Sequence, residues 1–443
     1  MEHRPEESTT LREAGGKDNR QVINTTEVDS GGLKGTLKNT FASTAYREFN
    51  WLWLGQMSHA FALWLEQIAR PLLILALTDS ATQLGLVILT RTIPAVVLGL
   101  VAGVIADNFN RRMVLIVTKV IVFGLSVVFA ILVVTGWVEV WHIYFFSFLR
   151  GATMAFDQPA RRAMIPSIVP AHLVTNAMAL STGSMQVMRI AGAATAGFLM
   201  DSFGLAAPFV AIVIIYIFAI FFTWKLNVPD HQRSGYQGAR RMGGDLIEGL
   251  QFAWRTPTVK GVLIIALGYF TFGMAFMQVF APLFAVDVLD IGYQGFGFMI
   301  SLMGAGGVVG ALILASANPS KGRGNLMLGL LVVFGLLLTI FATVASLNLV
   351  VVAFAVVAII GMAQSAFFPL INSILIEAAP DHMRGRVMGV MSLDRAMMAF
   401  GGAAAGILAD RIGVEISQII FGIACILTAV GMFTFYPPLR HIK

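Results

Sequence analysis

Long apolar runs recur along this 443-residue chain from about residue 50 to its end. A helix that crosses a membrane needs about 20 mostly apolar residues. Runs of that length can be drawn twelve times, with short polar stretches between them. They cover about 50–78, 82–106, 112–135, 140–160, 173–200, 204–225, 260–286, 294–316, 325–345, 349–373, 386–409 and 414–437. The sequence therefore predicts an all-α membrane protein with twelve transmembrane helices.

The composition agrees with a membrane protein. Apolar residues make up 57% of the chain and charged residues only 12%, about half the charged fraction of a typical soluble domain. The single cysteine, Cys425, excludes an intramolecular disulfide and a zinc site built from cysteines alone. The sequence holds no HExxH, GxSxG or ATP-binding P-loop pattern, which disfavours an enzyme. We expect no cofactor and no metal site.

Lys and Arg are distributed unevenly between the two sides that these runs define. If the N-terminus is cytoplasmic, the tail and inner loops hold 23 of the 30 basic residues, and the outer loops hold only Arg411. The acids of the outer loops are Asp79, Glu139, Asp201, Asp287, Asp290, Asp410 and Glu415. Cytoplasmic loops carry such an excess of Lys and Arg. We expect a multi-pass protein of the cell (inner) membrane with both termini cytoplasmic, which contacts lipids and binds no nucleic acid.

Polar segments divide the chain into four parts. Residues 1–46 lack the apolar stretch of a signal peptide and predict a flexible cytoplasmic tail. Six runs fall within 47–225 and six within 260–443, so each of these parts is predicted to be a six-helix bundle. The linker at 226–259 holds the basic, glycine-rich HQRSGYQGARRMGG, then DLIEGLQFAWRTP, which has the spacing of an amphipathic helix.

The two six-run parts resemble each other in sequence. MRIAGAATAGFLMDSFG at 188–204 matches MMAFGGAAAGILADRIG at 397–413, an offset of 209 residues. FDQPARRAMIPSIVP at 156–170 partly matches FFPLINSILIEAAP at 367–380. A repeat of this kind predicts two pseudo-symmetric bundles with a substrate between them near the middle of the membrane.

A polar motif, GVIADNFNRR, separates the second run from the third. It resembles the signature of the major facilitator superfamily, G-x-L-A-D-R-x-G-R-[KR]-x-x-L. The matching positions are Gly103, Ala106, Asp107, Arg111, Arg112 and Leu115. Asn108 and Asn110 depart from the usual Arg and Gly. The resemblance covers residue 46 to the C-terminus, and REFNWLWLGQ, FDQPARRAMIPSIVP and HMRGRVMGV resemble the branch with macrolide-efflux and enterobactin-exporter-like proteins.

The resemblance implies a conformational gate at this motif, formed by Gly103, Asp107 and the two arginines. Asp107 ends a helix and can contact the N-terminal dipole of another helix or a nearby cation. Asp157, at the inner end of the fourth run, is the expected partner of Arg111 or Arg112. The alternative is that both arginines only set the topology.

Two of the 24 acids, Glu66 and Asp394, lie well inside apolar runs, where a charge costs about 2.5–3.5 kcal/mol. Gln56, His59, Glu66 and Arg70 are spaced along one face of the first helix. Such a stripe should face water or substrate. Glu66 and Arg70 can form a structural i,i+4 ion pair. Alternatively, Glu66 binds a proton in one conformation and releases it in another, with Asp394 as the second candidate.

Four arginines inside the runs complete the predicted site. Arg150 in FLRGATMAF resembles the Arg-Gly feature of proton-coupled members, which implies that it acts on a protonated carboxylate or binds an anionic substrate. The resemblance implies that Arg91, Asp394 and Arg395 lie at the interface between the bundles, with ion pairs from one bundle to the other as their default role. Arg189 is expected at the same interface. Antiporter-like members carry Gly-Pro in the fifth run, whereas this chain has Gly-Ala at 192–193.

The resemblance also implies a substrate cavity lined by runs 1, 4, 7 and 10. Gln56 and His59 belong to the first of these. The seventh and tenth offer Tyr269, Phe272, Phe276, Gln278, Gln364, Phe367 and Asn372. Aromatic and methionine side chains suit a large amphipathic substrate. Plain helix packing is the alternative role for each of them.

These features predict a secondary active transporter that works by alternating access. The first hypothesis is proton-coupled export of drug-like amphipathic small molecules, with the proton gradient as energy source and a monomer as the working unit. The alternatives are an exporter of a siderophore, lysolipid or metabolite, a uniporter, and a sensor with this fold that does not transport.

Overall fold

The computed structural model describes residues 40–108, 110–228, 248–317, 322–391 and 393–440. Within these ranges the chain is helical and holds no β-strand, as the predicted all-α class requires. Residues 1–39 of the predicted tail and the basic stretch of the predicted linker lie outside the described residues. The amphipathic stretch that follows is helical over 248–255.

Six long helices form the first part of the described chain. They are α2 (Arg47–Thr78), α3 (Ala81–Asn108), α4 (Arg111–Val134), α5 (Val140–Ile168), α6 (Val174–Phe203) and α7 (Ala207–Lys225). The second part contains α9 (Pro257–Gly268), α10 (Ala281–Leu283), α11 (Gly292–Ala317), α12 (Arg323–Ser346), α13 (Val350–Ala378), α14 (Asp381–Met391), α15 (Leu393–Ile412) and α16 (Val414–Phe435). Short turns of helix lie at η1 (Ala42–Ala45), η2 (Ala171–Leu173) and η6 (Pro437–Leu439).

Nine helical segments of the described residues are long and apolar enough to cross a membrane. The other three runs expected from the sequence correspond to α5, α6 and α15, which are long but more polar. α5 continues to Ile168, eight residues beyond its predicted end, despite Pro159 and Pro166. This extension places Asp157 inside the helix instead of at its end.

The seventh apolar segment is not the uniform α-helix expected from its sequence. Between α9 and Val288 the helix contains three wider, π-helical stretches of five residues each: η3 (Tyr269–Gly273), η4 (Phe276–Phe280) and η5 (Phe284–Val288). Such wide turns often occur at functional sites in α-helices. The segment therefore presents its side chains in a register that the 3.6-residue period does not predict.

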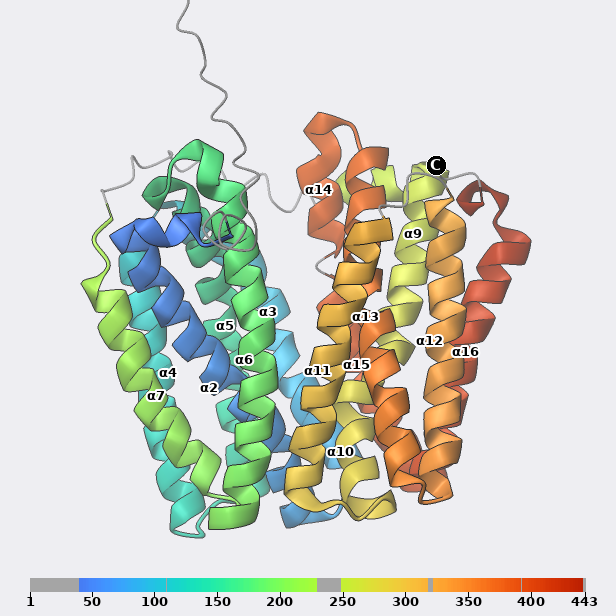
Figure 1. The fold of residues 1–443 in the computed structure, drawn as a ribbon, viewed down its shortest axis with the longest axis horizontal. Helices are drawn as coiled ribbons and strands as arrows, with labels where there is room; N and C mark the ends of the chain where they lie inside the picture. The colour runs from blue at the N-terminus through green and yellow to red at the C-terminus, as the bar shows by residue number, and fades with distance from the viewer. Residues whose placement is uncertain (1–39, 109, 229–247, 318–321, 392, 441–443) are drawn as a thin grey trace, which may run out of the picture.

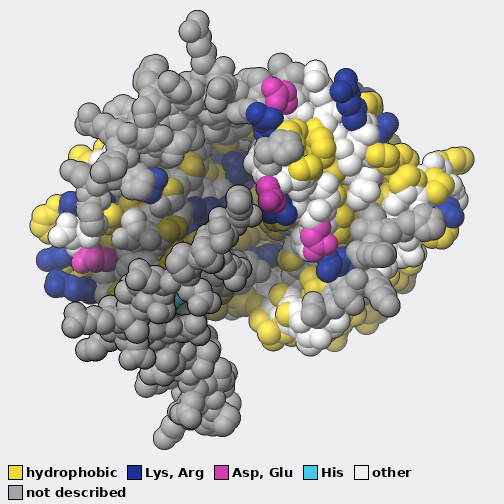
Figure 2. All heavy atoms as spheres, turned by 90° about the horizontal axis from the view of Figure 1, so that it is seen from above, with side chains coloured by type: hydrophobic (Ala, Val, Ile, Leu, Met, Phe, Trp, Pro, Cys, Tyr) yellow, Lys and Arg dark blue, Asp and Glu magenta, His cyan; other side chains and the backbone are white. Residues whose placement is uncertain are grey.

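The helices form two groups side by side, α2–α7 and α9–α16 (Figure 1). α2 begins and α16 ends at the same end of the molecule, which we name the terminal end. The opposite end, where α2 leads into α3 and α15 leads into α16, is the far end. Seen from the terminal end, the molecule is hollowed between the two groups, and Lys and Arg side chains lie in the hollow (Figure 2).

Glycines allow the two groups to meet at close range toward the far end. A Cβ added to Gly85 of α3 would lie 2.6 Å from the carbonyl oxygen of Gly402 in α15. A Cβ on Gly197 of α6 would lie 2.7 Å from the carbonyl oxygen of Tyr293 in α11. Small residues permit such approach of backbones. The small residues of GAATAG at 192–197 in α6 thus allow close helix approach, as their size predicts, and this contact helps to close the far end.

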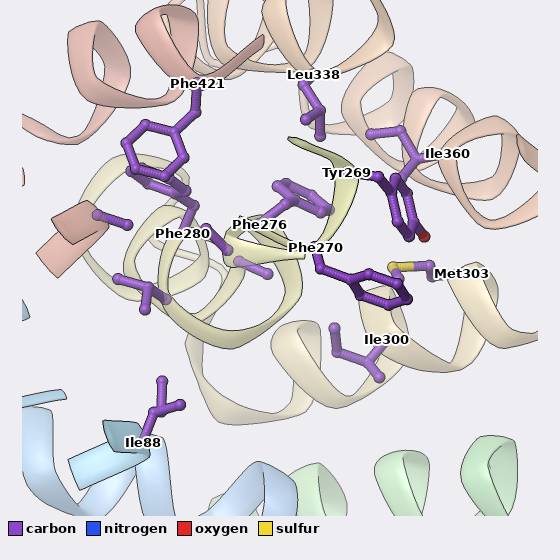
Figure 3. Close-up of a cluster of buried hydrophobic side chains, with 14 of the residues drawn as sticks. Ile88, Tyr269, Phe270, Phe276, Phe280, Ile300, Met303, Leu338, Ile360 and Phe421 are labelled. Atoms are coloured by element: carbon purple, nitrogen blue, oxygen red, sulfur yellow. The ribbon is translucent and has the colours of Figure 1, made fainter. Parts of the chain in front are cut away.

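Aromatic side chains fill the core of the second group (Figure 3). The rings of Tyr269 and Phe367 stack with centroids 4.3 Å apart. Phe276 meets Phe341 of α12 edge-on at 5.0 Å. Such pairs add to the free energy gained from burying the rings. Aromatic packing against α12 and α13 thus holds the seventh segment in place.

Candidate functional site

Glu66 lies at the centre of a buried ion cluster in the first group. Its side chain, 6% exposed, receives hydrogen bonds from Arg70 one turn along α2 and from Nε of Arg150 in α5, the latter at 2.8 Å. The predicted i,i+4 pair is therefore found, and Arg150 makes it a triad of one carboxylate and two guanidinium groups. A buried carboxylate needs such partners.

The cluster continues through polar side chains into α7. Nη2 of Arg150 donates to the hydroxyl oxygen of Tyr216 at 2.6 Å, and that oxygen lies 3.2 Å from Nδ1 of His59. Because Tyr216 already accepts a hydrogen bond from Arg150, its hydroxyl hydrogen is free for His59. Glu66 and His59, two members of the predicted stripe, therefore belong to one network of three helices.

A second buried ion cluster surrounds Asp157, which is 5% exposed. One carboxylate oxygen lies 3.3 Å from Nζ of Lys119, and the other lies 3.4 Å from Nε of Arg161 and 3.9 Å from Nε2 of His59. His59 thus links this cluster to that of Glu66. The sequence pattern marked only Glu66 and Asp394 as deep acids and missed Asp157, because it ended the fourth helix too early.

In this structure Asp157 does not pair with Arg111 or Arg112. Arg111 donates to the carbonyl oxygen of Ala163 at 2.7 Å, and Arg112 donates to that of Trp224 at 2.8 Å. Both arginines therefore satisfy carbonyl groups near the C-terminal ends of α5 and α7, where cations are favourable. Asp157 lies deeper in α5, beyond this layer.

The remaining gate residues are only partly described. Asn110, one of the departures from the superfamily motif, caps α4 by accepting hydrogen bonds from the backbone N–H groups of Arg112 and Met113. Asparagine is a preferred N-cap residue, so this departure has a local structural role. The side chain of Asp107 and the surroundings of Gly103 lie outside the described residues.

The interface arginines contact neutral groups instead of the acids expected for them. Nη2 of Arg189 lies 3.4 Å from Oε1 of Gln364, and Nη2 of Arg395 lies 3.0 Å from Oε1 of Gln158. Both contacts join the two groups of helices. Arg91 donates to Gln67, in its own group. The expected interdomain ion pairs are therefore not found among the described residues.

Asp394 lies in α15 and is half-buried. Its Oδ1 accepts a hydrogen bond from the backbone N–H of Arg395 at 2.6 Å. The sequence predicted one helix over 386–409 with Asp394 inside it. Among the described residues the chain is helical up to Met391 and again from Leu393.

The predicted cavity residues fall into two sets. Some of these side chains are fully buried and the others are half-buried. The buried set is Gln56, Tyr269, Phe276 and Phe367. The half-buried set is His59, Phe272, Gln278, Gln364 and Asn372. Gln56 donates to the carbonyl oxygen of Ser181, and Asn372 to that of Phe368. In this conformation the buried aromatics contribute packing.

Asp410 joins the two groups at the far end, a role that was not predicted from the sequence. Its carboxylate accepts hydrogen bonds from the hydroxyl of Ser80 and from the backbone N–H groups of Ala81 and Thr82, at 2.8, 2.8 and 2.9 Å. These N–H groups begin α3. A carboxylate at a helix N-terminus satisfies its free donors and its dipole. The last turn of α15 thus caps the first turn of α3.

Asp410→Ala should open the far end by removing these three hydrogen bonds. A carboxylate at a helix N-terminus contributes about 0.3–2 kcal/mol, enough to shift a balanced equilibrium severalfold. Spin labels at Asp79 and Asp290, in a Cys425→Ala background, should report longer distances than in the parent protein. Glu415→Ala, at the same end, is the control and should leave the distances unchanged. Equal distances in all three proteins would contradict a latching role.

A family model described as transmembrane secretion effector (MFS_3) matches residues 38–443. The chain belongs to this family. Its members are transporters of the major facilitator superfamily and not enzymes, so the resemblance noted in the sequence is confirmed. A mutant of the nucleoside transporter NupG has the same fold, with a TM-score of 0.74 at 12% identity over 88% of this chain and 100% of that one.

Relatives within the superfamily include three exporters or transporters. The multidrug efflux pump Tap of Mycolicibacterium fortuitum is 26% identical over 389 residues, 85% of this chain and 92% of Tap. The staphyloferrin A transporter of Staphylococcus aureus is 24% identical, over 84% of this chain and 92% of that protein. Macrolide efflux protein A of Streptococcus pyogenes is 23% identical, over 86% and 94%. The predicted macrolide-efflux branch is therefore confirmed.

Proposed function

We propose that this transporter is a proton-coupled exporter of amphipathic small molecules. Two bundles, 47–225 and 260–443, each of six spans, would alternate access to a site between them, with both termini in the cytoplasm of the cell (inner) membrane. The protein would act as a monomer, without a cofactor. In that orientation, the closed far end and the hollow at the terminal end correspond to an inward-open conformation.

One observation carries the proton-coupled part of the proposal. Glu66 is a buried carboxylate shared between Arg70 and Arg150, and Arg150 donates to Tyr216, whose hydroxyl contacts His59. A carboxylate so placed changes its proton occupancy when a neighbouring guanidinium moves away. Helices that move between conformations would therefore also move the proton. A purely structural pair would need only one of the two arginines.

Two classes of cargo have support among the relatives. Tap and macrolide efflux protein A favour a drug-like cargo, whereas the staphyloferrin A transporter favours a siderophore. Lysolipids and other metabolites share the same amphipathic character. The aromatic and methionine side chains of the seventh segment suit any of these cargoes.

Transport by purified protein in liposomes tests the proposal. Liposomes with an imposed pH gradient should accumulate a labelled macrolide or a carboxylate siderophore, and a protonophore should abolish accumulation. Without a gradient, the same liposomes should still exchange labelled for unlabelled cargo. If the cargo only equilibrates across the membrane and the pH gradient has no effect on it, the protein is a uniporter. Absence of both movements, for every cargo class, would favour the non-transporting sensor.

A further inference from the structure

A small pocket lies between the two groups of helices, next to the Glu66 cluster. The first group contributes Gln67, Arg70 and Arg91 to its wall, and the second group contributes Met277, Gln278 and Ile300. Its polar wall residues are two guanidinium groups and two amides, and the rest of the lining is apolar. No carboxylate of the described residues lines it.

The two arginines leave donor capacity unused in this pocket. Arg70 is 7% exposed, and its Nε is buried without a hydrogen-bond partner, although its terminal nitrogens bind Glu66 and Ser147. Arg91 donates to the amide oxygen of Gln67 and pairs with no carboxylate of the described residues. A guanidinium has five N–H donors, and buried charges are normally paired.

The opposite wall of the pocket also contains a buried polar atom without a hydrogen-bond partner. Oε1 of Gln278 is buried without a hydrogen-bond partner. A half-turn of this amide would present its two N–H donors to the pocket instead. Donors from both groups of helices would then converge on one small space, as recognition of an anion requires.

The electrostatics around the pocket point in the same direction. Among the described residues, Glu66 pairs with Arg70 and Arg150, whereas Arg91 and Arg189 pair with no carboxylate. Nη2 of Arg189 lies 3.7 Å from Sδ of Met277, which lines the pocket. Glu66 is already bound by two guanidinium groups. The region thus attracts anions and repels cations.

The size of the pocket limits the group that it can hold. The volume that solvent can occupy within the pocket is about 40 Å³. One water needs about 10–15 Å³ by this measure. The space therefore accepts a few water molecules or one carboxylate, but not a whole drug-like molecule.

We propose that this pocket binds the anionic group of the cargo, a carboxylate or a group of its size, between Arg70 and Arg91. The inference rests on export as the proposed function and adds the substrate class: amphipathic anions. An anion held there touches both groups of helices and stabilises the conformation with the far end closed. The apolar body of the cargo extends toward the hollow, past Met277.

A matched pair of probes tests the site in the purified full-length protein. The probes are a dansyl-labelled fatty acid and its primary amide, which share one apolar body and differ in charge at neutral pH. The parent protein should bind the carboxylate about tenfold more tightly or better, since hydrogen bonds to a charged group are stronger than those to a neutral amide. Equal affinities for the two probes would overturn the proposal.

Variants then locate the preference. Arg91→Gln should bring the two affinities together by weakening only the carboxylate, and Arg91→Lys should retain part of the preference. Arg395→Gln, at an interface arginine outside the pocket, should leave the preference intact. If Arg91→Gln weakens both probes equally, or leaves the preference unchanged, Arg91 does not bind the anionic group and the proposal fails.

Sodium acetate distinguishes a free anion from the headgroup of a cargo. If acetate raises the unfolding temperature of the parent protein but not of Arg91→Gln, a free carboxylate is sufficient to fill the pocket. If acetate has no effect while the labelled fatty acid does, the apolar body is also needed; both results support the site. If the parent protein prefers the carboxylate probe but shows no gradient-driven transport, proton-coupled export is refuted and the anion site is still supported.

Discussion

Glu66→Gln should reduce gradient-driven accumulation of cargo to the level of liposomes without protein. Glutamine resembles protonated glutamate in shape and cannot release a proton. Cargo binding and exchange without a gradient should persist, because neither requires net proton movement. The measurement is transport of one labelled cargo in both modes, with the protein content of the liposomes matched.

Stability must be separated from coupling in this experiment. Glu66→Gln leaves the guanidinium groups of Arg70 and Arg150 without their shared carboxylate, which costs about 3–5 kcal/mol when a buried pair is broken. Glu66→Asp keeps the charge and serves as the control. The double variant Glu66→Gln, Arg70→Gln removes one unpaired cation. If that double variant is stable and pumps normally with the gradient, Glu66 is a structural ion and Asp394 becomes the next candidate.

The fold class was predictable because membrane helices have a strong sequence signal. Long apolar runs, the asymmetry of Lys and Arg and the internal repeat all depend on local composition. The i,i+4 pair of Glu66 and Arg70 was predictable for the same reason, since it needs only helical spacing. Arg150 was expected to act on a carboxylate only through the family resemblance, and Tyr216 was not predicted, because contacts between helices depend on packing that one sequence does not specify.

The misplacement of Asp157 has its physical origin in a helix boundary. Asp157 was placed at a helix end because the apolar run stops near residue 160, whereas buried polar side chains allow α5 to continue to Ile168. The end of an apolar run marks where contact with lipid ends. The helix itself can continue further when its polar residues find partners within the protein.

Asp410 makes the kind of contact that was expected of Asp107, whose own side chain lies outside the described residues. From the sequence motif, Asp107 was expected to contact the N-terminal end of a helix across the bundles. The structure has that kind of contact at the far end, between Asp410 and the start of α3. The repeat aligns Asp410 with Asp201, so the signal was present in the sequence as an acid retained at the end of both copies.

Asp157→Asn should be among the most destabilising single substitutions of the first group. The carboxylate holds Lys119 and Arg161 in a buried site, and its loss leaves both cations unpaired. Removing one partner of a buried ion pair costs about 3–5 kcal/mol. Unfolding of the purified protein in a denaturing detergent measures the change. Asp201→Asn makes the same chemical change at an exposed acid and should stay within about 0.5 kcal/mol of the parent.

A double-mutant cycle shows which cation Asp157 pairs with. Asp157→Asn and Lys119→Gln should be non-additive, with a coupling energy within the range of about 0.5–3 kcal/mol seen for residues in contact. Asp157→Asn and Arg111→Gln should be additive, because Arg111 binds the carbonyl oxygen of Ala163 instead. Coupling to Arg111 and none to Lys119 would restore the pairing expected from the sequence motif. Asp157 would then have the role in the gate that the sequence analysis expected.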